Sequence, residues 1–345
     1  MSERVAATLK DVAALAGVST AAASFALRGR PGVSEATRER VAAAAAELHY
    51  STNIAARNLR TQATAAIGLY LPGHVTSSAY YMDVAFGVAA AAHERDLAVV
   101  LLPNTPDARA AAAHVDGFIV VDVADDDPGA IAILAGRRPV VSGEHVAATM
   151  ARPAGSVVSD HDSAMTALLD HLRSSGARHV AILAPPLDTA WGREIRQAFE
   201  RWSVADGTEA LLAEVPFATE VEAVAAACTD LLLGHPGIDA IIAVPDGSAS
   251  CVLPAAKAIG RIVGEDLLVA AYVDSAGNRL LDPPVTAFDL RPRAFGEACA
   301  ELLASILDGT GPTAGSPEAT EVADIELVIR RSSVPAAFVR PFSGD

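Results

Sequence analysis

Residues 8–50 read TLKDVAALAGVSTAAASFALRGRPGVSEATRERVAAAAAELHY, and this stretch decides the fold of the N-terminal end. Thr8 with Asp11 three residues later has the form of a capping box, and Gly17 ends the first helix after about two turns. Ser19 is a good N-cap for a second helix, because its hydroxyl can accept from the first free N–H groups. This second helix is expected to run from Thr20 to Leu27. Two short helices joined at a glycine predict a helix-turn-helix.

A third helix closes a small core over the first two. Ser34 is its expected N-cap, and its apolar side chains recur at helical spacing. The residues expected on the buried faces are Val12, Leu15 and Ala16 of the first helix and Val41, Ala45 and Leu48 of the third. Asn53 caps a further helical turn, which is too short to be stable without a partner or a ligand.

Four ordered blocks carry a family resemblance: TLKDVAALAGVS at 8–19, STAAAS at 19–24, VSEATRERV at 33–41 and NIAARNL at 53–59. Together they resemble the DNA-binding head and hinge of the LacI-type family, which includes the lac and purine repressors. The resemblance implies a helix-turn-helix head at 1–52, a hinge helix and linker at 53–64, and a two-lobed effector-binding and dimerisation body at 65–345. The competing interpretation is a helical oligomerisation module.

The resemblance places the second helix in the major groove, with its N-terminal side chains at the base edges. Ala21 and Phe25 can touch a thymine methyl group but cannot hydrogen-bond to a base. Many members of the family carry arginine, histidine or tyrosine at the position of Phe25. In the hinge, Leu59 is implied to be a wedge in the minor groove, the alternative being a contact between hinge and body. The predicted DNA-contacting residues are Thr8, Ser19, Thr20, Ala21, Ser24, Phe25, Arg28, Asn53, Arg57, Leu59 and Arg60.

The charge of the chain is unevenly divided. The 345 residues include 42 acidic and 26 basic side chains, for a net charge of -16, yet residues 1–64 carry a net charge of +3 and the remainder carries -19. A small basic head on an acidic body fits a DNA-binding module joined to a domain with another task. The three cysteines form no C-x-x-C pair, and no secretion signal or apolar run of membrane length occurs. We therefore expect a cytoplasmic protein without a disulfide framework.

From residue 65 onward, short β-rich runs alternate with amphipathic stretches. This alternation predicts an α/β body of parallel sheets covered by helices on both faces. It is built from two lobes, at about 65–159 and 160–290, and resembles periplasmic sugar-binding proteins, with a helix at 293–307 that is expected to return to the first lobe. Strands are expected at 66–71, 98–102, 117–121, 179–184, 239–244 and 267–272, and the segment IELVIRRSS resembles the family's last strand.

In such a body a ligand binds beyond the carboxyl ends of the strands, between the lobes. The predicted effector-binding residues are Tyr80, Tyr81, Asp160, Trp191, Arg193, Asp246 and Asp274. The aromatic residues could instead belong to the core, and Asp246 could instead cap a helix. Asp160, His161 and Asp162 could be read as a metal site, but consecutive residues at a strand-to-helix junction point in different directions. We expect no metal and no cofactor.

The sequence thus predicts a dimeric regulator, in the role of a repressor, that binds a near-palindromic double-stranded operator under the control of a sugar or other metabolite. No motif of nucleotide binding, nucleophilic hydrolysis or zinc-dependent catalysis occurs, so an enzyme is not expected. Pro245 and Val273 replace polar residues that are common in sugar-responsive relatives. Two alternatives therefore stay open: a regulator that has lost effector control, and a free small-molecule binding protein.

Overall fold

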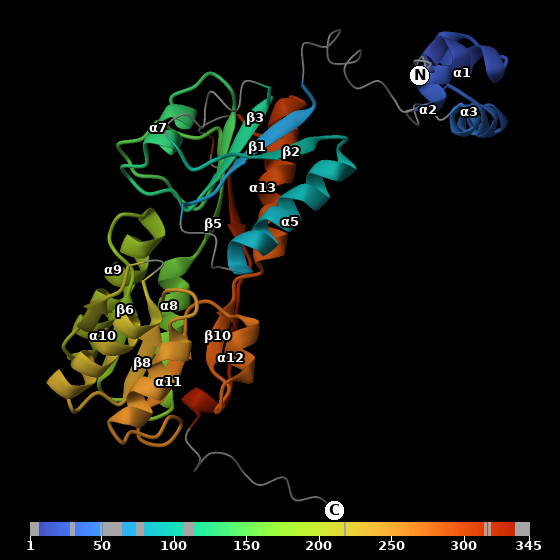
Figure 1. Cartoon of the computed structure of the whole chain (residues 1–345). Helices are drawn as coiled ribbons and strands as arrows, with labels where there is room; N and C mark the ends of the chain where they lie inside the picture. Colours follow the sequence, from blue (N-terminus) through green and yellow to red (C-terminus); the bar gives the residue numbers. More distant parts are fainter. Residues whose placement is uncertain are drawn as a thin grey trace, which may run out of the picture. The chain divides into compact units, whose positions relative to one another are not determined.

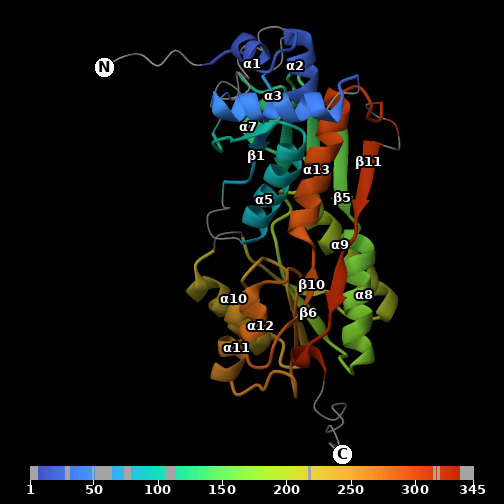
Figure 2. The ribbon, with the colours of Figure 1, turned by 90° about the vertical axis from the view of Figure 1, so that its right-hand side faces the viewer.

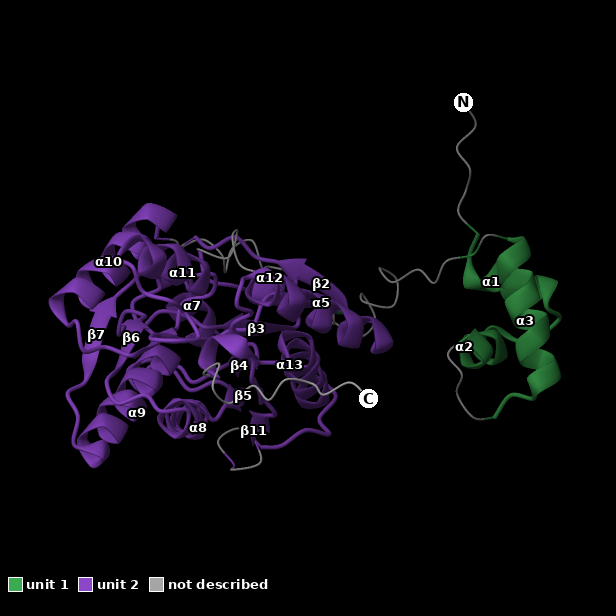
Figure 3. Cartoon of the chain, turned by 90° about the horizontal axis from the view of Figure 1, so that it is seen from below, with its two compact units in different colours: residues 1–65 green, residues 66–345 purple. Residues whose placement is uncertain are grey.

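The computed structural model describes residues 7–27, 32–48, 50, 64–73, 79–105, 114–216, 219–313, 316 and 319–334. The chain forms two compact units, Met1–Ala65 and Ala66–Asp345 (Figure 3). None of the helices in these described ranges is long and apolar enough to cross a membrane.

The first unit has the predicted helices, α1 (Leu9–Leu15), α2 (Thr20–Leu27) and α3 (Glu35–Glu47). The predicted caps are present at all three N-termini. The backbone N–H and the hydroxyl of Thr8 both donate to Asp11 Oδ2, at 2.8 and 2.7 Å. Ala22 N donates to Ser19 Oγ at 3.1 Å, and Ser34 accepts from the backbone of α3 in the same way. These caps satisfy N–H groups that the helices leave free, and so fix where each helix begins.

The core of this unit is made mostly of alanine, which lets the three short helices approach closely. Its members are Val12, Ala13, Ala16, Ala23, Val41, Ala44 and Ala45, with Leu48 packed against them. The prediction for Leu15 was wrong, since this side chain is 47% exposed. The buried arc of α1 is centred on Ala13 and Ala16, which leaves Leu15 beyond its edge.

The second unit contains two six-stranded sheets, each the centre of one lobe (Figure 1). The sheet of lobe 1 is parallel throughout, in the order β11-β5-β4-β3-β1-β2. Helices α5 and α13 pack on one of its faces and α7 on the other. The strands are β1 (Ala66–Tyr70), β2 (Ala98–Leu101), β3 (Gly117–Val121), β4 (Val140–Gly143), β5 (Gly155–Ser159) and β11 (Thr320–Ala323), and the helices are α5 (Ala79–Glu94), α7 (Pro128–Leu134) and α13 (Pro292–Leu307).

Lobe 2 is built in the same way, in the order β12-β10-β9-β8-β6-β7, and among the described strands of this sheet the β10–β12 pair alone is antiparallel. Helices α8 and α9 cover one face, and α10 and α11 cover the other. The strands are β6 (Val180–Ala184), β7 (Leu211–Glu214), β8 (Ala240–Ala243), β9 (Leu268–Ala271), β10 (Thr286–Asp289) and β12 (Glu326–Val328). The helices are α8 (His161–Ser174), α9 (Ala190–Asp206), α10 (Val221–Gly234), α11 (Ala249–Ala258), α12 (Ala276–Leu280) and the 3-10 turn η3 (Arg331–Ser333).

The chain crosses between the lobes three times: after β5, after β10, and between β11 and β12. The predicted return to lobe 1 is confirmed, because α13 contributes Phe295, Cys299 and Leu303 to the core beneath that sheet. The strands predicted in the body are all present, and the structure adds β4, β5, β7, β10 and β11, which the prediction left out. These short strands contain glycine, serine or acidic residues, which weaken the β signal.

Helices α5 and α13 lie side by side (Figures 1 and 2) and touch through their backbones. A Cβ placed on Gly296 would lie 2.1 Å from the carbonyl oxygen of Val84, and one on Gly87 would lie 2.0 Å from that of Arg293. Glycine is therefore required on both helices at this crossing, because no side chain fits between the two backbones.

Candidate functional site

Helix α2 presents the side chains expected to read DNA on the face opposite its core contact. Ala23 is fully buried, whereas Thr20 and Ala21 are exposed and Phe25 is 41% exposed. Ser24 is half-buried, and Ser19 and Thr8 are exposed at the helix N-termini that they cap. The surface of α2 therefore offers a small, mostly apolar face with hydroxyl groups near its start, which suits close approach to base edges.

Five predicted DNA contacts lie outside the described residues: Arg28, Asn53, Arg57, Leu59 and Arg60. Their roles stay predictions that rest on the sequence blocks alone.

A cavity of about 290 Å³ lies between the two lobes of the body, at the carboxyl ends of their strands. Of the predicted effector residues, it brings together Tyr80 and Tyr81 from α5, Trp191 from α9, and Asp246 from the loop after β8. The rings of Tyr80 and Tyr81 meet edge to face, with centroids 5.1 Å apart. Its position is the one expected for a ligand site in a two-lobed α/β body.

Two buried acids that the sequence analysis did not select form the polar floor of this cavity. Asp122 follows β3 and Glu144 follows β4, and both have a positive φ, of 48° and 69°. The Glu144 carboxylate accepts hydrogen bonds from the backbone N–H and the hydroxyl of Ser159, the latter at 2.8 Å. A left-handed backbone at two neighbouring strand ends is strained for residues other than glycine, and such strain concentrates at functional sites.

His161 links this acidic floor to lobe 2. Its Nε2 lies 3.2 Å from Glu144 Oε2, and its Nδ1 lies 2.8 Å from the hydroxyl of Tyr272. Burial lowers the pKa of His161, but the neighbouring Glu144 outweighs that effect, so the pKa is raised above its usual value. The imidazole is therefore held in contact with a carboxylate from the other lobe.

Burial is the main cause that raises the pKa of Asp122, to about 7, and the charge of Glu144 adds to it. Tyr81 and His161 oppose the shift. A carboxyl with a raised pKa keeps its proton in the folded protein while the unfolded chain has already lost it. The free energy of unfolding therefore falls as the pH rises from about 4 to about 7.

We expect Asp122→Asn to flatten the pH dependence of stability. The penalty on the wild-type chain is on the order of 2–4 kcal/mol between pH 4 and pH 7, and asparagine removes it while tolerating a positive φ. Urea unfolding at pH 5 and pH 8 measures the effect, with the variant gaining relative to wild type at pH 8. Asp308→Asn, at an exposed carboxylate paired with Arg95, is the control. Parallel pH profiles for wild type and Asp122→Asn would contradict the assignment.

Arg193 and Asp160, two other predicted effector residues, lie outside the cavity lining. Arg193 forms a two-pronged ion pair with Asp125 of lobe 1 and also donates to Leu187 O at 2.9 Å. The backbone N–H of Asp125 also donates to Asp188 O at 2.8 Å. The Arg193–Asp125 ion pair and this backbone bond together join the two lobes. Asp160 caps α8 by accepting from Ser163 N at 3.0 Å, a bond that lowers its pKa. As ligand contacts, both stay predictions that this geometry does not favour.

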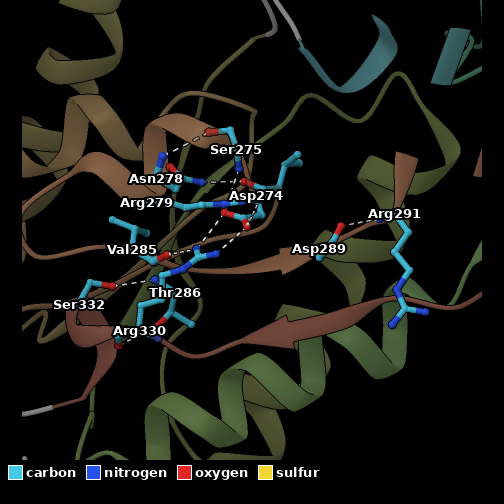
Figure 4. Close-up of polar contacts among 11 residues, drawn as sticks. Asp274, Ser275, Asn278, Arg279, Val285, Thr286, Asp289, Arg291, Arg330 and Ser332 are labelled. Carbon is cyan, nitrogen blue, oxygen red and sulfur yellow. Dashed lines mark hydrogen bonds and ion pairs between the residues drawn. The ribbon is translucent and has the colours of Figure 1, made fainter. Parts of the chain in front are cut away.

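Asp274 also does not line the cavity. Its carboxylate is bound by arginine side chains (Figure 4). Its carboxylate accepts from Arg330 Nη1 and Nη2 at 2.8 and 2.6 Å, and Arg279 Nη2 lies 3.4 Å away. The Asp274 side chain is 5% exposed and that of Arg330 is 14% exposed. Arg330 is also tied to β10, since its N–H donates to Thr286 Oγ1 at 2.8 Å. This pair fastens the segment after β12 to lobe 2.

Asp122 could have been found in the sequence, because it directly follows the predicted strand at 117–121. Glu144 follows a strand that was not predicted, so its position at a strand end was hidden. His161 drew attention only as part of a possible metal site. Among the residues that the structure describes, no group of three or more potential ligands is placed to hold a metal ion.

Two family models match this chain. Residues 8–53 match the model of bacterial regulatory proteins of the lacI family, and residues 169–333 match that of the periplasmic binding protein-like domain. The HTH-type transcriptional regulator CelR of Thermobifida fusca is 29% identical over 347 residues, which covers 96% of this chain and 100% of that protein. Neither model describes an enzyme.

Solved structures of regulators share the fold. A transcriptional regulator CelR–cellobiose complex matches with a TM-score of 0.71 and 28% identity, covering 94% of this chain and 99% of that one. The lac repressor dimer bound to operator and the anti-inducer ONPF matches with a TM-score of 0.75 over 96% of this chain and 100% of that one. At 22% identity, this second likeness concerns the fold alone.

Proposed function

Since the chain belongs to the LacI-type family of bacterial regulatory proteins, we propose that it is a cytoplasmic, dimeric repressor of transcription. It binds a near-palindromic operator through the head, and a small molecule in the cavity between the lobes adjusts that binding. The observation that carries the proposal is the presence, in one chain, of a capped helix-turn-helix and a two-lobed body with a cavity at the strand ends. The cellobiose in the CelR complex favours a sugar or a molecule of similar size as the effector.

Exposed apolar side chains on lobe 1 support a homodimer. Met82 and Phe86 on α5 are 50% and 55% exposed, and Leu101 on the edge strand β2 is 65% exposed. Large apolar side chains left exposed on α5 and on an edge strand are typical of a protein interface, and a two-fold dimer would match a palindromic site. Effector control then requires that the ligand bind one arrangement of the lobes more tightly than the other.

Selection of operator DNA tests the proposal. The full chain is incubated with random duplexes at moderate salt, and bound sequences are recovered and measured by fluorescence anisotropy. We expect a near-palindromic sequence bound about a thousandfold or more tightly than random competitor. A chain lacking residues 1–65 is the control and should bind no duplex. If the full chain selects no sequence, with or without candidate metabolites, the proposal fails.

Leu59→Ala is expected to lower specific affinity about ten- to a hundredfold while leaving non-specific affinity within about twofold. An apolar wedge stabilises a bent duplex that only the specific complex contains, so its loss affects only that complex. Anisotropy with operator and with random DNA measures both affinities. Equal losses on the two DNAs would refute the wedge.

Arg193→Ala is expected to abolish the effector response while operator binding persists, because the substitution removes an ion pair that joins the lobes. The measurement is operator affinity as a function of effector concentration. Arg196→Ala is the matched control, since Arg196 lies on the same helix and pairs within lobe 2, with Glu214 at 2.9 Å. Reversing the pair, with Arg193→Asp and Asp125→Arg together, should restore part of the response. An unchanged response in Arg193→Ala would contradict this role.

A further inference from the structure

The walls of the inter-lobe cavity carry several acidic groups and, among the described lining residues, no lysine or arginine. The carboxylic acids and the imidazole in the lining are Asp122, Glu144, Asp246 and His161. Arg193, the arginine predicted to reach a ligand, is instead paired with Asp125. The His161 imidazole, which contacts Glu144, is a single possible positive charge against three acids, so the lining is acidic.

A second hollow that borders the cavity is also acidic. The two share Asp122 and Pro216, and the second is lined by Asp126, Asp127 and Asp188, again without lysine or arginine among its described lining residues. Part of this charge is used internally, because Asp127 caps α7 and accepts from the hydroxyl of Tyr70 at 2.7 Å. Carboxylates therefore line both hollows.

Asp122 itself is incompletely bonded. Its side chain is 7% exposed, and its Oδ1 has no hydrogen-bond partner among the described residues. A buried carboxylate without a cation is costly, and it is relieved either by taking up a proton or by meeting a positive charge. Asp122 is a lining residue of both hollows, so a ligand in either one lies beside this acid.

Aromatic rings complete the cavity. Tyr80, Tyr81, Trp191 and Tyr272 line it, and the Trp191 ring lies with its centroid 6.1 Å from that of His161. Faces of tryptophan and tyrosine attract cations, and they do so most strongly where water is excluded. Carboxylates and aromatic faces around one space are a combination that recognises organic ammonium groups.

We propose that the effector of this regulator carries a positively charged nitrogen that Asp122 and Glu144 bind, and that phosphorylated and carboxylated molecules are excluded from the cavity. The inference rests on the proposed function, in that it takes this cavity as the effector site. An anion would bring a further negative charge to two buried carboxylates, and among the described lining residues only the His161 imidazole could offset it. A neutral sugar could hydrogen-bond to Asp122 but would leave its charge unbalanced.

Matched pairs of probes that differ only in charge provide the test: glucosamine with glucose, the β-1,4-linked glucosamine disaccharide with cellobiose, and benzylamine with benzyl alcohol. Titration calorimetry on the full chain at pH 7 is expected to show at least one ammonium probe binding tenfold or more tightly than its neutral partner. Repeating the titration in buffers of different ionisation enthalpy should show proton release for that probe. This follows because a cation drives the proton from Asp122, which faces Glu144, His161 and Tyr81.

Asp122→Asn is expected to reduce the preference for the ammonium probe at least tenfold and to remove the proton release, while Asp308→Asn keeps both. A thermal melt of each variant shows whether it is folded, and the wild-type comparison stands without the variant. Equal or tighter binding of the neutral partners, binding of glucose 6-phosphate, or binding of no ammonium probe at 10 mM would each overturn the inference. Operator selection in the same preparation separates these outcomes from failure of the proposed function.

Discussion

Gly296→Ala is expected to destabilise lobe 1 by about 3 kcal/mol or more, because the new Cβ would lie 2.1 Å from the Val84 carbonyl oxygen. Neither helix can yield locally, since the contact is between two backbones and not with the end of a flexible side chain. Separating α5 from α13 would loosen the core that both helices form beneath the sheet. The backbone of α13 itself would tolerate alanine, which has the higher helix propensity.

Two spectroscopic signals locate the damage. Both tryptophans lie on α9 in lobe 2, but Trp191 also lines the inter-lobe cavity. The test therefore uses a Trp191→Phe background, in which Trp202, bonded to Asp170 of α8, reports on lobe 2, while far-ultraviolet circular dichroism reports on the whole chain. In urea, the variant should lose helical signal before its tryptophan signal changes. Gly234→Ala is the matched control, because a Cβ there meets no atom within 4 Å; it should be neutral or slightly stabilising. If the free energy of unfolding of Gly296→Ala lies within about 0.5 kcal/mol of the wild-type value, glycine is not required where α5 and α13 cross.

Asp274→Ala is expected to destabilise lobe 2 by about 3–5 kcal/mol, because it leaves the largely buried guanidinium of Arg330 without its carboxylate. Loss of this pair also frees the segment after β12, which Arg330 and Ser332 bind to β10 and its neighbour. Ser332 accepts from Thr286 N at 2.9 Å and donates to Val269 O at 2.6 Å. Tryptophan fluorescence in urea should record the change directly.

The comparison with Arg279→Ala makes this second prediction specific. Arg279 is 64% exposed, so its removal should cost no more than about 1 kcal/mol. If Asp274 instead acted as a ligand contact, Asp274→Ala would weaken effector binding and leave the unfolding midpoint near that of wild type. That result would contradict the structural role of Asp274 and support the prediction that it contacts the effector.

Local signals predicted most of the architecture. Thr8, Ser19 and Ser34 are short-range caps, and their geometry depends on residues within three positions, so the head could be read directly from its sequence. The strands at 66–71 and 117–121 are long apolar runs, buried on both faces of a parallel sheet, and such runs are easily recognised. Strands such as β4 and β7 are short and carry serine or glutamate, and only their neighbours in the sheet make them strands.

The site was less predictable, because its partners are distant in sequence. Tyr80, Tyr81, Trp191 and Asp246 follow or open recognisable elements, and they do line the cavity. For Arg193 in the first turn of α9 and Asp274 after β9, the side chain had two possible partners, a ligand or another protein group. The ion pairs with Asp125 and Arg330 depend on loops that fold together from separate parts of the chain. Glycines such as Gly296 gave no local signal, because the need for them arises only where two helices meet.

The three crossings between the lobes also set an order of assembly during synthesis. Lobe 2, apart from its last strand and turn, is encoded by one continuous stretch between about residues 160 and 290, so it can form while the ribosome is still translating. Lobe 1 starts earlier but must wait for α13 and β11 near the end of the chain. Until then, the apolar face that α13 will cover is open on the nascent polypeptide. We expect chaperones that act on growing chains to hold this regulator by its first-made lobe, and truncation before residue 292 to leave that lobe prone to aggregation.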